Sequence, residues 1–93
     1  MQNLLKKRIK KIKEEIQGLD IIRPGKLSKQ KRGINSRYNY LSYTFRNKGE
    51  TDYIKEKYMP KIIRETNNFK KFRELSDEWI ELSIKLSKLE MES

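Results

Sequence analysis

A repeating apolar pattern in the C-terminal third constrains the fold of this 93-residue chain more than any other feature. Apolar residues recur there at alternating intervals of three and four: Phe72, Leu75, Trp79, Leu82, Leu86 and Leu89. Such spacing puts them on one side of an α-helix, like the seam of a coiled coil. Pro60 suits a first helical turn, so we predict a long helix within residues 59–93. Its seam needs a partner: another helix of the chain, a second copy, or a larger protein.

A second stripe begins the chain, over Leu5, Ile9, Ile12, Ile16 and Leu19. It predicts a helical arm over residues 1–18, with Asn3 as N-cap and Gly18 as its stop. The other sides of this helix are basic: Lys6, Lys7, Arg8, Lys10, Lys11 and Lys13. Acids border the C-terminal seam: Glu74, Asp77, Glu78 and Glu81. Antiparallel pairing of the two helices, within or between chains, would join opposite charges. The basic side alternatively contacts phosphates, stays solvated, or lies on a membrane.

Residues 19–58 predict a basic loop and a β-hairpin. Pro24-Gly25 indicates a turn, and residues 38–45 form a strand rich in Tyr and Phe. A loop over residues 46–49 would place Gly49 at positive φ, before a second strand over residues 51–57. Alternation puts Tyr38 and Tyr40 on one face, with Leu41, Tyr43 and Phe45 on the other, which we expect to be the core. The opposite assignment of the faces stays open. The predicted fold is α+β, a single small domain.

The positive charge is confined to one half. Residues 1–48 contain 14 Lys and Arg against 3 acids, a net charge of 14 − 3 = +11, and residues 49–93 contain 9 against 10, a net of −1. Self-repulsion of this kind is offset by a polyanionic partner, first of all nucleic acid. The chain has no Cys and no His, and no group of residues suggests a catalytic site. We therefore predict a protein with no enzymatic activity, no cofactor, no metal and no membrane partner, in the cytoplasm.

Candidate contact residues cluster between the two helices. Cations on a loop can follow phosphates, and exposed tyrosines can stack on bases. The candidates are Arg23, Lys26, Lys29, Lys31, Arg32, Arg37, Tyr38, Tyr40, Arg46 and Lys48. A solvated loop and tyrosines packed in the core are the alternatives. Tyrosine stacking leans towards single strands or RNA, but the residues alone do not separate DNA from RNA or single from double strands.

Several short motifs also resemble a known family. They are Pro24-Gly25-Lys26-Leu27-Ser28, Tyr38-Asn39-Tyr40-Leu41-Ser42-Tyr43-Thr44, Lys48-Gly49, Asn68-Phe69-Lys70-Lys71-Phe72-Arg73-Glu74-Leu75 and Trp79-Ile80-Glu81-Leu82. In their order the chain resembles an uncharacterised family of small bacterial and archaeal proteins, often encoded near transposases. The resemblance implies a mobile-element or defence setting. The family's Cys-rich loop is replaced here by residues 29–37, so its implied metal site does not carry over.

Two functional hypotheses follow. The first is a non-enzymatic nucleic-acid-binding accessory protein that contacts phosphates through its basic half. The second is a helical adaptor, a homo-oligomer or a subunit of a larger complex, that docks through the seam from Phe72 to Leu89.

Overall fold

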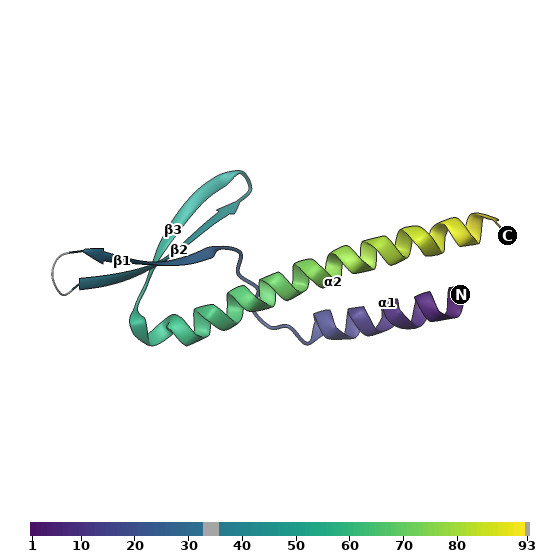
Figure 1. Ribbon diagram of the computed structural model, residues 1–93, viewed down its shortest axis with the longest axis horizontal. Coiled ribbons are helices and arrows are strands. Elements are labelled where there is room, and N and C mark those ends of the chain that lie inside the picture. Colours follow the sequence, from purple (N-terminus) through teal and green to yellow (C-terminus); the bar gives the residue numbers. More distant parts are fainter. Residues whose placement is uncertain (33–35, 93) are drawn as a thin grey trace. The chain divides into compact units, whose positions relative to one another are not determined.

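The structure is a computed structural model that describes residues 1–32 and 36–92. The elements in these ranges are α1 (Gln2–Gln17), β1 (Lys26–Arg32), β2 (Ser36–Phe45), β3 (Lys48–Ile54), the short 3-10 helix η1 (Glu56–Tyr58) and α2 (Met59–Glu92) (Figure 1). Two helices and an antiparallel sheet make the protein α+β, which confirms the predicted fold class.

The chain divides into two compact units. Met1–Asp20 and Lys70–Ser93 make the first, which we call the helical unit, and Ile21–Phe69 make the second, the sheet unit. Helix α2 contributes residues to both.

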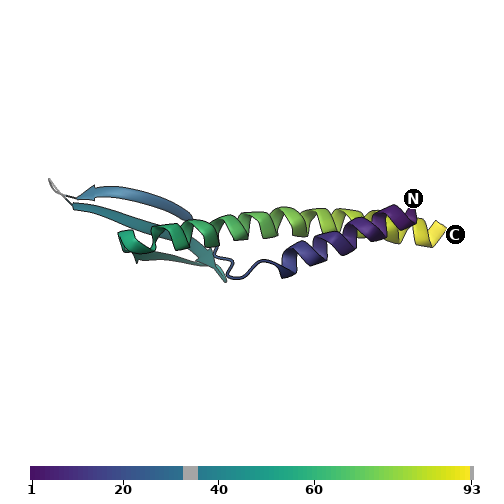
Figure 2. The same cartoon turned by 90° about the horizontal axis from the view of Figure 1, so that it is seen from below.

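In the helical unit, α1 lies antiparallel beside the second half of α2 (Figures 1 and 2). Ile12 of α1 is fully buried, and Leu75 of α2 is nearly so. The seam of α2 therefore has its helical partner within the same chain. One detail of the prediction is wrong: the N-cap of α1 is Met1, not Asn3, and no side chain caps the helix.

The sheet unit holds three antiparallel strands in the order β1-β2-β3. Residues 29–32 belong to β1, where the sequence predicted a loop, because their backbone pairs with β2 from Lys26↔Ser42 to Arg32↔Ser36. Strand pairing satisfies backbone hydrogen-bonding groups, and this gain overrides the low strand propensity of Lys. Gly33 and Asn35, predicted to be in the same loop, lie outside the described residues.

The β2–β3 turn is tighter than predicted. Phe45 pairs with Lys48, so Arg46 and Asn47 alone connect the strands. They take positive φ values of 53° and 64°, as the favoured two-residue hairpin turns require. Gly49 instead lies within β3. The shorter turn starts β3 at Lys48, and the strand ends at Ile54, earlier than predicted.

The core of the sheet unit lies between one sheet face and the start of α2. Leu41, Ile54, Met59 and Ile62 form it, with Tyr43 packed at its margin. The expected assignment of the faces is thus confirmed for Leu41 and Tyr43. It is wrong for Phe45, which is 59% exposed because it lies next to the turn, beyond the core cluster.

Helix α2 continues without interruption through Asn67-Asn68. The Asn68 side chain donates a hydrogen bond of 3.1 Å to the carbonyl oxygen of Ile21. Arg23 donates its backbone N–H to the Glu65 carbonyl oxygen at 3.1 Å. These bonds hold the segment before β1 against α2 within the sheet unit.

Candidate nucleic-acid interface

The face of the sheet opposite the core is the candidate contact surface, and we call it the open face. Strand alternation and the register place Tyr40, Tyr53 and Lys26 on it. Its other described residues are small and mostly hydroxyl-bearing: Ser28, Ser42, Thr44, Gly49 and Thr51. All of these residues except the half-buried Tyr40 are exposed.

Two tyrosines sit at the centre of the open face. Tyr40 on β2 is the register partner of Tyr53 on β3. Their ring centroids are 6.1 Å apart and their planes meet at 65°, an edge-to-face contact. Tyr53 is 53% exposed, so part of its ring surface is accessible to a planar ligand. A base stacked on such a ring gains dispersion contact and covers apolar surface, which is worth about 1–3 kcal/mol per base.

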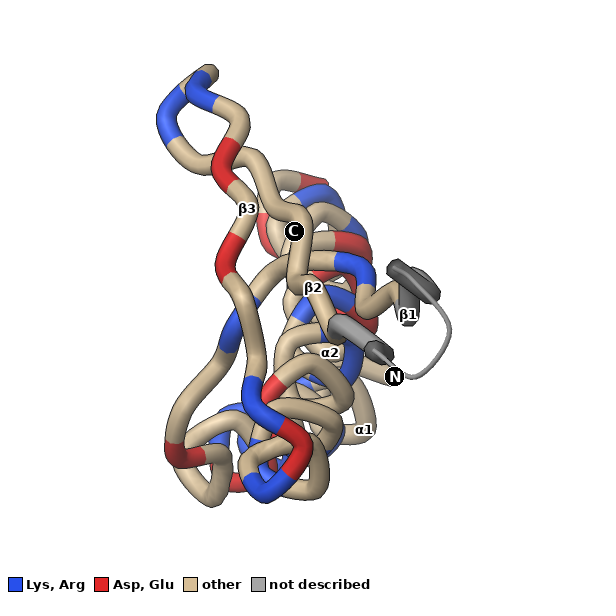
Figure 3. The backbone as a smooth tube through the Cα atoms, turned by 90° about the vertical axis from the view of Figure 1, so that its left-hand side faces the viewer, with Lys and Arg blue, Asp and Glu red and all other residues tan. Residues whose placement is uncertain are grey.

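The carboxylates of β3 lie on one side of the sheet. The acids of β3, Glu50 and Asp52, alternate to the core-facing side, whereas no described position on the open face is acidic. Figure 3 shows the acidic positions along β3 and the basic positions at the hairpin tip. A face with hydroxyl groups, aromatic rings and a Lys but no carboxylate does not repel a phosphate backbone.

A shallow hollow borders the open face near the β2–β3 hairpin. It is lined by Gly25, Lys26, Ser42, Tyr43, Thr44, Gly49, Glu50 and Thr51. Lys26 and the hydroxyl-bearing residues can bind a phosphate or sugar there. Glu50 lies at the rim and is 3.5 Å from the ammonium group of Lys48.

A second hollow lies at the edge of β3. Its lining includes Tyr53, Lys55, Tyr58 and Lys61. Tyr58 is 47% exposed, and the Lys57 ammonium lies 5.0 Å from its ring centroid. Aromatic rings and lysines thus continue beyond the open face along this edge.

Arg23 is engaged inside the sheet unit. Its guanidinium group donates to the Asp52 carboxylate at 2.6 Å and lies 5.2 Å from the ring centroid of Tyr43. These contacts are on the core-facing side. Of the predicted contact residues, Arg23 has the clearest structural role.

The remaining predicted cations lie toward the two ends of β2. Lys29, Lys31 and Arg32 are on β1, and Arg37 and Tyr38 are on β2. For residues 29–32 and 36–38 the structure describes the backbone and not the side chains. At the other end, the Arg46 guanidinium lies 5.1 Å from the Phe45 ring centroid, and Lys48 is 81% exposed. Strand β2 has 10 residues and spans about 30 Å. The cations at its start and those at its end therefore lie far apart, with Tyr40 between them.

The basic side of α1 belongs to the helical unit. Arg8 donates two hydrogen bonds to the Glu78 carboxylate, at 2.7 and 2.8 Å. These bonds raise the pKa of Arg8 and lower the pKa of Glu78. The Lys13 ammonium lies 5.2 Å from the Trp79 ring centroid. Exposed lysines remain at Lys6, Lys7, Lys10 and Lys11.

The predicted interface residues of α2 lie along the side next to α1. Leu75 is buried, and Phe72, Trp79, Leu82, Leu86 and Leu89 are half-buried. Met1 and Leu5 share an apolar hollow with Leu89. An adaptor would therefore have to dock beside α1 or displace it.

Sequence reasoning missed Tyr53, Lys55 and Tyr58. Tyr53 fell within the predicted strand over residues 51–57, but its pairing with Tyr40 depends on the register. A loop with an even number of residues, either 46–47 or the predicted 46–49, places Tyr53 on the face of Tyr40, whereas a three-residue loop would place it on the other face. The parity of the turn was therefore the available signal.

Neither a metal site nor a membrane span was found in the part of the chain that the structure describes. No group of three or more Asp and Glu residues in these ranges is arranged to hold a metal ion. No described helix has the length and apolar character needed to cross a bilayer.

The chain was compared with protein-family models, with curated proteins and with solved structures, and no match was found in any of the three. The family resemblance drawn from the motifs stays a prediction.

Proposed function

We propose that the protein is a non-enzymatic, cytoplasmic nucleic-acid-binding accessory protein that uses the open face of its sheet. The observation that carries the proposal is the pairing of Tyr40 with Tyr53 on a face where no described residue is acidic. The excess charge of residues 1–48, a net of +11, supplies the general attraction to phosphates. The resembling family adds a mobile-element or defence setting.

Single-stranded DNA or RNA suits this surface better than a duplex. Bases in a duplex present only their edges in the grooves, whereas an unpaired base can lie flat on an exposed ring. Lys26 on the open face would contact the backbone while Tyr53 stacks on a base, and the cations toward the two ends of β2 would add general attraction. The contact is then tolerant of sequence, because every base has a π-face.

The first experiment compares Tyr53→Ala with Tyr53→Phe by fluorescence anisotropy, using labelled single-stranded DNA, single-stranded RNA and duplex DNA. Loss of the ring should weaken single-strand binding by about 1–3 kcal/mol, roughly 5- to 100-fold. Tyr53→Phe keeps the stacking surface and serves as the matched control. It should bind within about twofold of the parent chain.

Two results would contradict the proposal. If the parent chain binds none of the three probes at about 50 mM salt, the function is wrong, since electrostatic binding is strongest at low salt. If it binds but Tyr53→Ala and Tyr53→Phe bind alike, the open face is not the contact surface.

A further inference from the structure

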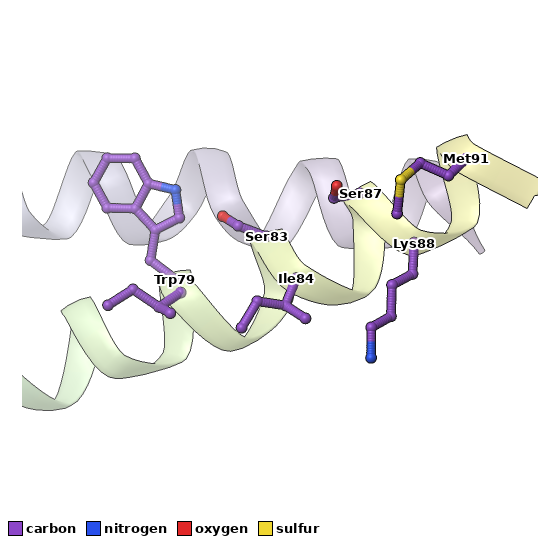
Figure 4. A pocket seen from close by; sticks show the side chains of 7 residues that line it. Trp79, Ser83, Ile84, Ser87, Lys88 and Met91 are labelled. Carbon is purple, nitrogen blue, oxygen red and sulfur yellow. The ribbon is translucent and has the colours of Figure 1, made fainter.

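A second apolar stripe runs along α2 beside the seam that faces α1. Ile80, Ile84 and Met91 are 59%, 51% and 75% exposed. Together with Trp79 they line a groove on the helical unit, in which Trp79 and Met91 lie at opposite ends (Figure 4). Every residue that lines the groove belongs to α2.

We propose that this groove binds the same segment of a second copy of the chain, packed antiparallel. The stripe recurs at intervals of four, three and four, over Ile80, Ile84, Ser87 and Met91. In an antiparallel pair, the same alignment that puts Ile84 opposite Ser87 of the second copy also puts Ile80 opposite Met91. Each level of the pair then contains at least one large apolar side chain, so the association buries apolar surface.

The charges beside the stripe favour this orientation. Glu81 and Lys88 follow Ile80 and Ser87 directly, so they lie along one edge of the groove. In an antiparallel pair, Glu81 of each copy approaches Lys88 of the other, which gives two ion pairs. In a parallel pair the same two residues would lie opposite Ser76 and Ser83, and neither ion pair would form.

The net charge of the helical unit is small. Residues 1–20 and 70–93 contain 11 Lys and Arg against 9 acids, a net of 11 − 9 = +2, whereas residues 21–69 contain 12 against 4, a net of 12 − 4 = +8. Two copies can therefore approach through the helical unit at little electrostatic cost.

The association is measured by sedimentation equilibrium on the full chain, after nuclease treatment and at about 0.5 M salt, which suppresses nucleic-acid binding. Ile84→Glu places a charge in the interface and should weaken dimerisation at least tenfold. Ser87→Leu completes the stripe and should tighten it by about tenfold or more. Both positions lie on the exposed side of α2, so circular dichroism should show the parent helix content.

Charge exchange tests the orientation at about 50 mM salt, where the ion pairs are least screened. Glu81→Lys and Lys88→Glu should each weaken the dimer several-fold, and the double variant should restore it, since both pairs re-form with reversed signs. Lys85→Gln is the control: it removes the 3.5 Å contact of Lys85 with Glu81 inside one helix and should leave the dimer unchanged.

Three outcomes would overturn the inference. A chain that stays monomeric up to about 1 mM has no such interface. If neither Ile84→Glu nor Ser87→Leu changes the dissociation constant of the dimer, the dimer forms through another surface. A double charge variant as weak as the single variants rules out the antiparallel arrangement. None of these results depends on whether the open face binds nucleic acid.

Discussion

Gly25 has a backbone conformation that residues with side chains rarely adopt. Its φ is 137°, and an added Cβ would lie 2.8 Å from Cδ1 of Leu41 and 2.9 Å from the carbonyl oxygen of Ser42. Glycine permits this close approach of the segment before β1 to the core. Gly25→Ala should therefore cost about 1–3 kcal/mol of unfolding free energy, measured by urea denaturation.

Gly49 provides the matched control for that measurement. A Cβ there meets nothing within 4 Å. Gly49→Ala should change the unfolding free energy by about 0.5 kcal/mol or less. Equal losses in the two variants would show that the close approach at Gly25 is not what constrains this site.

The Arg8–Glu78 pair predicts a pH dependence. Hydrogen bonding to Arg8 lowers the pKa of Glu78 in the folded chain. The stabilisation from Glu78 is therefore complete above the ordinary carboxyl pKa of about 4.3 and is lost as the pH falls through the lower folded value. The melting temperature of the parent chain should exceed that of Glu78→Gln at pH 6, and the difference should shrink toward pH 3.

Glu81→Gln separates that effect from a general loss of negative charge. Glu81 lies 3.5 Å from Lys85 in the same helix and does not join α1 to α2. Its substitution should alter the melting temperature less than Glu78→Gln does at pH 6. A difference between parent and Glu78→Gln that stays constant from pH 6 to pH 3 would contradict the role assigned to the carboxylate.

At the scale of elements, the pairing of α1 with α2 depends on few buried side chains. Ile12 is fully buried, whereas Leu4 on the same helix is 70% exposed. Ile12→Ala should destabilise the helical unit by about 2–5 kcal/mol, since it leaves a cavity as well as losing apolar burial. Trp79, the single tryptophan, lies beneath Lys13 and reports the unfolding by its fluorescence.

Leu4→Ala is the control on the same helix. Its side chain is largely in water already, so the loss should be about 0.5 kcal/mol or less. If Ile12→Ala were no more harmful than Leu4→Ala, the seam of α2 would not depend on α1.

At the scale of the whole molecule, the position of charge matters more than its amount. Converting Lys29, Lys31, Arg32 and Arg37 to Gln should weaken nucleic-acid binding strongly. It should also reduce the slope of log affinity against log salt concentration by about 0.7–0.9 for each phosphate that the variant no longer neutralises. Anisotropy titrations at about 50 and 200 mM salt measure both quantities.

A second variant removes the same amount of charge elsewhere. Converting Lys70, Lys71, Arg73 and Lys85 to Gln takes four cations from α2 and leaves the sheet untouched. It should reduce the salt slope far less. Identical reductions in the two variants would mean that net charge alone attracts the nucleic acid, with no defined binding surface.

The limits of sequence reasoning are clearest in the sheet. Alternation along residues 38–45 correctly separated Leu41 from Tyr40, because period two is a property of one strand. The extent of β1 and the position of the hairpin turn were wrong, because each depends on which residues pair across strands. Pairing is decided by the balance of all interactions in the unit and leaves little trace in local composition.

The two helices, their apolar stripes and the one-sided distribution of charge could be predicted, since they follow from intervals and composition within single segments. Three features required the folded chain: α1 covers the seam of α2, Tyr40 and Tyr53 meet on the open face, and Ile80, Ile84 and Met91 are left exposed on α2. A local interval specifies which side of an element is apolar. Which distant segment covers that side depends on how the side chains of the whole unit pack together.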